Sequence, residues 1–201
     1  MIDGEGLVAA GASSGGIAYK FSGRVGEAAA YGAGCWAQEE TSIGVALSVS
    51  GVGERIMRHS VAEKCAIAEM EARSVSRAGG GISTAVSAAS AKSSLSTKDY
   101  VDYPQDIGVL CAVRWNEHCS AEGRDEGKKK VHVQLKACTS GATRSMAVGW
   151  LTCGEDGEVI DTQILRNDGD DEKAMEWLLI DGLAWEVSRL HEEKTSSHSS
   201  H

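Results

Sequence analysis

A strand followed by a helix, with glycines between them, is the pattern that most constrains the fold of this chain. Apolar residues alternate with small or polar ones over residues 43–50, which predicts a strand with one buried face. Gly51 and Gly53 end that strand, and from Glu54 to about Ala72 apolar residues recur at helical spacing. The acidic Glu54 suits the positive end of the helix. The sequence therefore predicts a fold that mixes strands and helices.

The same patterns give a coarse map of the remaining chain. They predict an Ala- and Ser-rich helix over about 82–92 and a short strand of small residues over 7–13. Further strands, expected to be antiparallel neighbours, are predicted over 107–115, 130–137 and 146–153. Residues 177–187 suit a helix face, but Asp181-Gly182 between two apolar tetrads is a hairpin signal, and we favour the hairpin. The Ser- and His-rich residues 193–201 have nothing to bury and are predicted to be disordered.

Composition excludes several classes of partner. The chain of 201 residues has a formal net charge of −9, which argues against nucleic acid as the main partner. No apolar run approaches membrane-spanning length, and no signal peptide is evident, so we expect a cytoplasmic or nuclear protein. The 6 cysteines lack CxxC spacing and favour reduced, mostly buried thiols. Glu117-His118-Cys119 lacks a second ligand pair at zinc-site spacing, so neither a metal nor a cofactor is expected.

Two generic motifs match the sequence weakly. Gly11-Ala12-Ser13-Ser14-Gly15 satisfies the G-x-S-x-G pattern of a serine nucleophile, but that motif needs a helix directly after it, and residues 17–26 have no helical periodicity. The run from Gly32 to Ala37 matches a dinucleotide fingerprint, yet no convincing strand precedes it and no helix follows. We interpret this second run as a turn that packs small residues.

Three glycine-flanked polar clusters, 12–16, 23–27 and 48–54, are more informative together than either motif. Arg24 offers a planar guanidinium that fits a carboxylate. Ser50 and Gly51 fall at a strand end before a helix, where backbone N–H groups favour a developing negative charge. Taken singly, Ser50 could be a helix N-cap, Arg24 part of a surface ion pair and Ser14 part of a turn. Their joint spacing favours a site that binds and polarises a carboxylate-bearing substrate.

These clusters resemble the catalytic subunit of the plant-type asparaginase family of N-terminal-nucleophile hydrolases. The resemblance covers roughly residues 2–165, and within the family it is strongest to the threonine aspartases, or taspases. It rests on Ala12–Gly16, Lys20, Gly23–Gly26, Tyr31–Ala37, Ser48–Glu54, Gly108–Leu110, Ser120–Glu122 and Ser145–Gly149. It implies an α+β fold in which residues 1–192 form half of a four-layer αββα sandwich. The other half would come from the first, or alpha, subunit of the same precursor.

The resemblance also assigns roles to individual residues. Ser50 and Gly51 would form the oxyanion hole, Ser14 would hydrogen-bond the nucleophile, and Arg24 would hold the acidic group of an aspartyl or asparaginyl substrate. Family members that act on small amino-acid derivatives carry an acidic residue, usually Asp, where Glu27 stands, and it pairs with the substrate ammonium. Glu27 therefore leaves two activities open, an endopeptidase that cleaves after aspartate and an asparaginase or β-aspartyl peptidase.

The family's nucleophile is a threonine at the first residue of the subunit, and its α-amine is the general base. Aligned by resemblance, that threonine falls about five residues before Met1, and residues 1–6 contain no substitute hydroxyl. We therefore expect the 201-residue chain to be inactive alone, either as a truncated enzyme half or as a non-catalytic partner chain. Without its companion, the strand predicted near Leu7 would lie at an open sheet edge.

Overall fold

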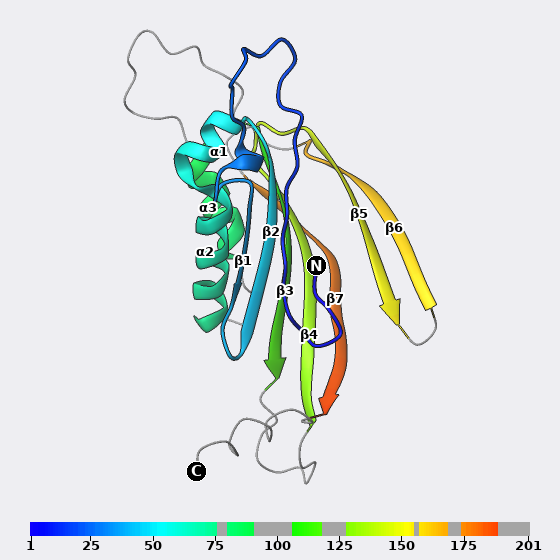
Figure 1. Ribbon diagram of the computed structural model, residues 1–201. Helices are drawn as coiled ribbons and strands as arrows, with labels where there is room; N and C mark the ends of the chain where they lie inside the picture. The colour runs from blue at the N-terminus through cyan, green and yellow to red at the C-terminus, as the bar shows by residue number, and fades with distance from the viewer. Residues whose placement is uncertain (76–79, 91–105, 118–127, 155–156, 169–173, 189–201) are drawn as a thin grey trace, which may run out of the picture.

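The computed structural model describes residues 1–75, 80–90, 106–117, 128–154, 157–168 and 174–188 (Figure 1). Its helices are a short 3-10 turn η1 (Glu27–Ala29), α1 (Gly53–His59), α2 (Val61–Val75) and α3 (Gly81–Ser90). Its strands are β1 (Cys35–Glu39), β2 (Ile43–Gly51), β3 (Ile107–Glu117), β4 (Lys128–Thr139), β5 (Ser145–Gly154), β6 (Gly157–Arg166) and β7 (Met175–Ser188). This mixture of helices and strands is consistent with an α+β fold; the complete αββα sandwich remains a prediction.

One antiparallel sheet with the strand order β1-β2-β3-β4-β7 forms the centre of the described part. Helices α1, α2 and α3 cover one face of this sheet (Figure 1). Every second residue of β2 and β3 points into that layer, and pairs such as Leu47 with Cys111 and Val45 with Val113 are fully or almost fully buried. They pack against Ile56, Val61, Cys65 and Ile82 from the helices. The alternation that predicted β2 therefore follows directly from burial of one face.

The opposite face of the sheet carries the N-terminal segment and, at one end, the β5–β6 hairpin (Figure 1). The strand predicted over residues 7–13 is wrong, because only an isolated bridge between Ile2 and Val8 forms there. The segment is instead attached through side chains: Glu39 accepts a bond from the Val8 N–H at 3.0 Å, and Ser48 donates to the Gly11 carbonyl at 2.6 Å. The segment therefore lies over the face of the sheet and not at an open edge, as was expected for the strand near Leu7. The edge strands of the sheet are β1 and β7.

The helix predicted from Glu54 to Ala72 is two helices, because the chain turns at Ser60. Ser60 has a left-handed backbone (φ 47°, ψ 55°) and ends α1 by donating its N–H to the carbonyls of Ile56 and Met57. The first N–H groups of α2 bond across to the carbonyls of the 32–33 turn, Ala62 to Ala33 at 3.2 Å and Glu63 to Gly32 at 3.0 Å. Long-range acceptors therefore replace the intrahelical bonds that the break removes.

The hairpin predicted at Asp181-Gly182 is also wrong, since β7 runs straight through these residues. Opposite β4 the register jumps from Asp181 paired with Gln134 to Leu183 paired with Val133, so Gly182 is an extra residue in a bulge. A bulge absorbs a glycine without reversing the chain. The alternative of a helix over 177–187 is excluded by the same pairing.

The predicted helix near 82–92 and the strands over 43–50, 107–115, 130–137 and 146–153 are present with small shifts in their bounds. β3 and β4 are antiparallel neighbours as expected, but β5 pairs with β6 in a separate two-stranded sheet. The run from Gly32 to Ala37 begins as the expected turn and continues into β1, which was not predicted. The predicted disordered tail, 193–201, lies outside the described residues.

Three cysteine thiols belong to the core between helices and sheet. Cys65, Cys111 and Cys138 are at most 1% exposed, and Cys35 and Cys153 are also free thiols. Burial raises the pKa of Cys65 to about 12 and raises the pKa values of Cys111 and Cys138 well above the ordinary range. Such thiols are poor nucleophiles, so the three buried cysteines have a packing role.

Candidate functional site

Eleven residues between positions 12 and 29 line a groove beside the end of β2. The chain passes Gly11, which is tied to β2 through Ser48, makes a loop over 12–23 and returns through η1. Figure 1 shows this loop at the same end of the molecule as α1. The groove has a volume of about 360 Å³, which is within the range of small-ligand sites. Its lining residues are Ala12, Ser13, Ser14, Gly15, Gly16, Lys20, Arg24, Val25, Gly26, Ala28 and Ala29.

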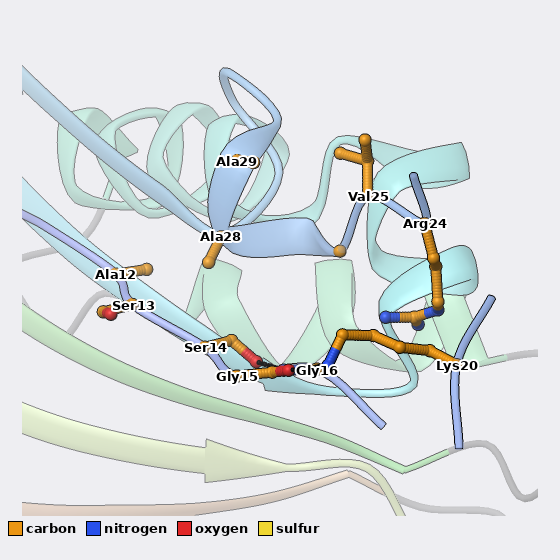
Figure 2. Close-up of a pocket in the computed structure, with 11 residues that line it drawn as sticks. Ala12, Ser13, Ser14, Gly15, Gly16, Lys20, Arg24, Val25, Ala28 and Ala29 are labelled. Carbon is orange, nitrogen blue, oxygen red and sulfur yellow. Dashed lines mark hydrogen bonds between the residues drawn. The ribbon is translucent and has the colours of Figure 1, made fainter. Parts of the chain in front are cut away.

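Two of the predicted site residues, Ser14 and Arg24, therefore share one groove (Figure 2). The Ser14 hydroxyl oxygen accepts the Gly16 N–H at 3.0 Å, so Ser14 does form the local turn that was its alternative interpretation. This bond occupies an acceptor position of the hydroxyl, so its proton stays available for donation. No strand precedes Ser13 and no helix follows it, so the strand-turn-helix of a serine nucleophile is not formed.

Arg24 is held by Glu54 at the first turn of α1. Its Nε and Nη2 both donate to Oε1 of Glu54, at 3.0 and 2.7 Å. The third nitrogen, Nη1, lies on the groove side, because β-carbons placed on Gly16 and Gly26 would come within 3.1 and 3.4 Å of it. In the described part of the chain Nη1 has no hydrogen-bond partner. One edge of the guanidinium is thus fixed by the protein, and Nη1 is left for a ligand.

The Glu54 carboxyl is acidified by its surroundings. A bond from its own backbone N–H lowers its pKa below the ordinary 4.5, and the bond from Arg24 lowers the pKa further. The Glu54 side chain is 56% exposed, so solvent screens the pair and its contribution to stability should be under about 1 kcal/mol.

Glu54→Gln should therefore have a small and pH-dependent effect on stability. Because the folded pKa is lower than the unfolded one, the contribution of the pair is complete above pH 4.5 and disappears as the pH falls through the folded value. Urea unfolding at pH 7 and pH 3 should show a larger difference from the wild type at pH 7 than at pH 3. The exposed Glu40, changed to Gln, is the control and should show no such difference. A difference that is equal at both pH values would contradict the assignment.

Glu27 lies behind Arg24. Its side chain is 7% exposed, and a β-carbon on Gly53 would lie 2.3 Å from Oε2 of Glu27 and 3.5 Å from Nη2 of Arg24. Gly53 is the first residue of α1, so the two side chains meet at the start of this helix. Glu27 is not among the described residues that line the groove. Its proposed pairing with a substrate ammonium stays a prediction.

Ser50 and Gly51 end β2, paired with Gly108 and Ile107. Gly51 has φ +142°, and a β-carbon there would lie 2.1 Å from the Asp106 carbonyl oxygen, so only glycine fits. The N-cap of α1 is Val52, which removes the alternative of Ser50 as N-cap. Both residues are exposed and lie two to three positions before Gly53, outside the described groove lining. Their role as an oxyanion hole stays a prediction.

Two residues of the site were not recognised as such in the sequence. Glu54 was interpreted only through the helix dipole, although its side chain binds Arg24. Lys20 was noted only within the family resemblance, although it lines the groove and donates to the Gly15 carbonyl at 2.6 Å. The spacing of two cations, Lys20 and Arg24, within a Gly- and Ser-rich loop was the signal that could have identified the second.

Within the described ranges, no three His, Cys, Asp or Glu side chains come together as metal ligands would. The sequence Glu117-His118-Cys119 has no described side chains. No described helix is both long and apolar enough to cross a membrane.

Comparison with known protein families gives a match that covers this site. Residues 1–96 match the family model described as Asparaginase. The matched region includes Ser14, Arg24, Glu27, Ser50 and Gly51. This match supports a hydrolase of the asparaginase-like, N-terminal-nucleophile type.

Proposed function

We propose that this chain forms the substrate-binding half of a threonine-type hydrolase, in which Arg24 binds the carboxylate of an aspartyl residue. The observation that carries this proposal is the fixed guanidinium: Glu54 holds Nε and Nη2, and Nη1 is left beside two glycines in the groove. An arginine fixed on one side loses little freedom when it binds a carboxylate on the other. The family match of residues 1–96 supports the hydrolase class.

The remaining predicted residues supply the chemistry around the bound carboxylate. A threonine hydroxyl, deprotonated by its own α-amine, would attack the carbonyl of the scissile bond. Backbone and hydroxyl donors at Ser50 and Gly51 would stabilise the oxyanion, and the Ser14 hydroxyl would donate a hydrogen bond to the nucleophile. No threonine is among the described residues that line the groove, so the proposed mechanism takes its nucleophile from a threonine outside that lining.

A companion subunit is proposed for the face of the sheet opposite the helices. Besides the N-terminal segment, that face exposes a second groove of about 340 Å³, lined mainly by small and apolar side chains. They include Ala46, Leu110, Ala112 and Leu135. The β5–β6 sheet has only two described strands and exposes Val159, Ile160 and Ile164. Two strands rarely form a stable layer alone, so further strands from the alpha subunit are expected beside them.

Between the two activities left open by the sequence, the geometry favours the endopeptidase that cleaves after aspartate. An asparaginase or β-aspartyl peptidase must pair the free ammonium of its substrate with a carboxylate. The described groove lining contains no acidic residue, and Glu27 is buried against Gly53. An internal aspartyl residue has a neutral amide instead of an ammonium, and it needs no such partner.

Hydrolysis assays test this proposal on an Asp-Gly peptide, asparagine and a β-aspartyl dipeptide. The 201-residue chain alone should turn over none of them. The second sample combines the alpha subunit with a version of this chain that is extended at its N-terminus and begins with threonine. This assembly should cleave the Asp-Gly peptide. Preference for asparagine or the β-aspartyl dipeptide would support the asparaginase or β-aspartyl peptidase activity, which Glu27→Gln should then abolish. A folded assembly without any activity would indicate a non-catalytic partner chain, and turnover by the chain alone would implicate Ser13 or Ser14.

A further inference from the structure

The groove contains two cationic side chains that converge on Gly16 (Figure 2). A β-carbon on Gly16 would lie 3.1 Å from Nη1 of Arg24 and 3.4 Å from Cδ of Lys20, so both side chains contact this glycine. Gly16 has φ +71°, a conformation in which other residues are strained. The position therefore brings the two cations together where a larger residue would separate them.

The position of Lys20 is fixed by local bonds. Its ammonium donates to the Gly15 carbonyl at 2.6 Å, above the turn that the Ser14 hydroxyl closes with the Gly16 N–H. The preceding residue, Tyr19, has a left-handed backbone with φ 54°, which is uncommon for a bulky residue. An ammonium has three donors, and the structure gives this one a single acceptor among the described residues. The other two donors are available to a ligand.

The charges near the groove are unevenly distributed. None of the described lining residues is acidic, although the whole chain has a formal net charge of −9. The two carboxylates next to Arg24 are Glu54, which takes its Nε and Nη2, and Glu27, beside Gly53; neither lines the groove. A concave site lined by positive charges without negative ones concentrates anions.

We infer that the groove binds a compact dianionic oxyanion of the phosphate or sulfate type, bridged between Lys20 and Nη1 of Arg24. This inference shares Arg24 with the proposed function but adds a second contact, through Lys20, that a single carboxylate does not need. The dianion would occupy the place of the substrate carboxylate, so the two ligands would exclude each other.

Calorimetric titration of the 201-residue protein with sulfate and methanesulfonate tests the inference. Both probes are tetrahedral oxyanions, and they differ by one negative charge. The wild type should bind sulfate at least about tenfold more tightly, since the second charged contact is made only by the dianion. Lys20→Gln should reduce the difference to about twofold or less, whereas Lys64→Gln, an equal loss of charge on the exposed side of α2, should preserve it. Arg24→Gln should weaken both probes.

Equal binding of sulfate and methanesulfonate by the wild type would overturn the inference, and so would an unchanged preference in Lys20→Gln. If Arg24→Gln then still weakened the binding of an aspartyl peptide, the proposed function would stand without the dianion site. Titrations with inorganic phosphate and with a phosphoserine peptide distinguish a free ion from a modified protein segment as the source of the bound dianion. Tighter binding of either probe than of methanesulfonate supports the site. Circular dichroism of each variant confirms that the fold is intact.

Discussion

Glu69→Gln should lower the free energy of unfolding by about 3–5 kcal/mol, because it removes the only negative charge that is fully buried between α2, α3 and the sheet in the described part of the chain. Oε1 of Glu69 accepts Arg73 Nε at 2.8 Å and Lys136 Nζ at 3.0 Å. Oε2 accepts the N–H groups of Gly80 and Gly81 at 3.1 and 3.2 Å, at the start of α3. One carboxylate therefore satisfies four donors.

A glutamine in this place keeps the size of the side chain but loses the charge and one acceptor. The Gln amide nitrogen would face two donors on one side, and Arg73 and Lys136 would lose a buried counter-ion. Lys136 keeps its pair with Glu176 at 3.0 Å, which limits the loss. Urea unfolding at neutral pH measures the effect, with the exposed Glu71→Gln on the same helix as control. A loss below about 1 kcal/mol would contradict a structural role for this network.

The elements that the sequence predicted well are those whose periodicity is produced by burial on one face. In β2 and β3 each helix-facing residue meets a helix-facing residue of its neighbour, such as Val49 opposite Val109, so the pattern in each strand records the same core. The helix α3 was predicted although Gly80 precedes it and Gly81 is its first residue. Their N–H groups bind Glu69, an acceptor 11 and 12 residues away, and this contact has no local signature.

The errors share a physical cause, which is that long-range partners override local signals. Asp181-Gly182 is a strong turn signal in isolation, but pairing with the 12 residues of β4 makes a bulge more favourable than a reversal. Ser60 carries no clear helix-ending signal, yet the helix turns there because carbonyls near Ala33 are placed to accept the first N–H groups of α2. Similarly, residues 7–13 have short strand character, but among the described residues they form only the isolated bridge between Ile2 and Val8.

The candidate site was predicted in its residue types more than in its contacts. Ser14 and Arg24 line one groove, whereas their roles toward a nucleophile and a substrate stay predictions. The orientation of Arg24 could not be predicted, because it depends on Glu54, 30 residues further along the chain. The burial of Glu27 depends likewise on the close approach of Gly53, which belongs to another element. Such contacts arise from the packing of η1 against α1 and are invisible to motif spacing.

Arg24→Ala should reduce kcat/KM for an Asp-Gly peptide by about 30- to 700-fold in the assembled enzyme, which corresponds to about 2–4 kcal/mol of transition-state binding. The loss is large because the Arg24 side chain is 15% exposed and already oriented by Glu54, so a bound carboxylate gains a charged, partly desolvated partner. Without Arg24, Lys20 is the remaining cation in the described lining, and its ammonium is bound to the Gly15 carbonyl.

Arg24→Lys separates charge from geometry in the same assay. A lysine restores one positive charge, but it cannot bind Glu54 through two nitrogens and present a third to the groove, so recovery should be partial. Lys64→Ala removes an exposed cation on α2 that does not line the described groove, and it should leave kcat/KM unchanged. If kcat/KM were unchanged in both Arg24 variants, Arg24 would have no place in substrate binding. If lysine restored full activity, any cation would suffice, and the fixed guanidinium edge would have no bearing on specificity.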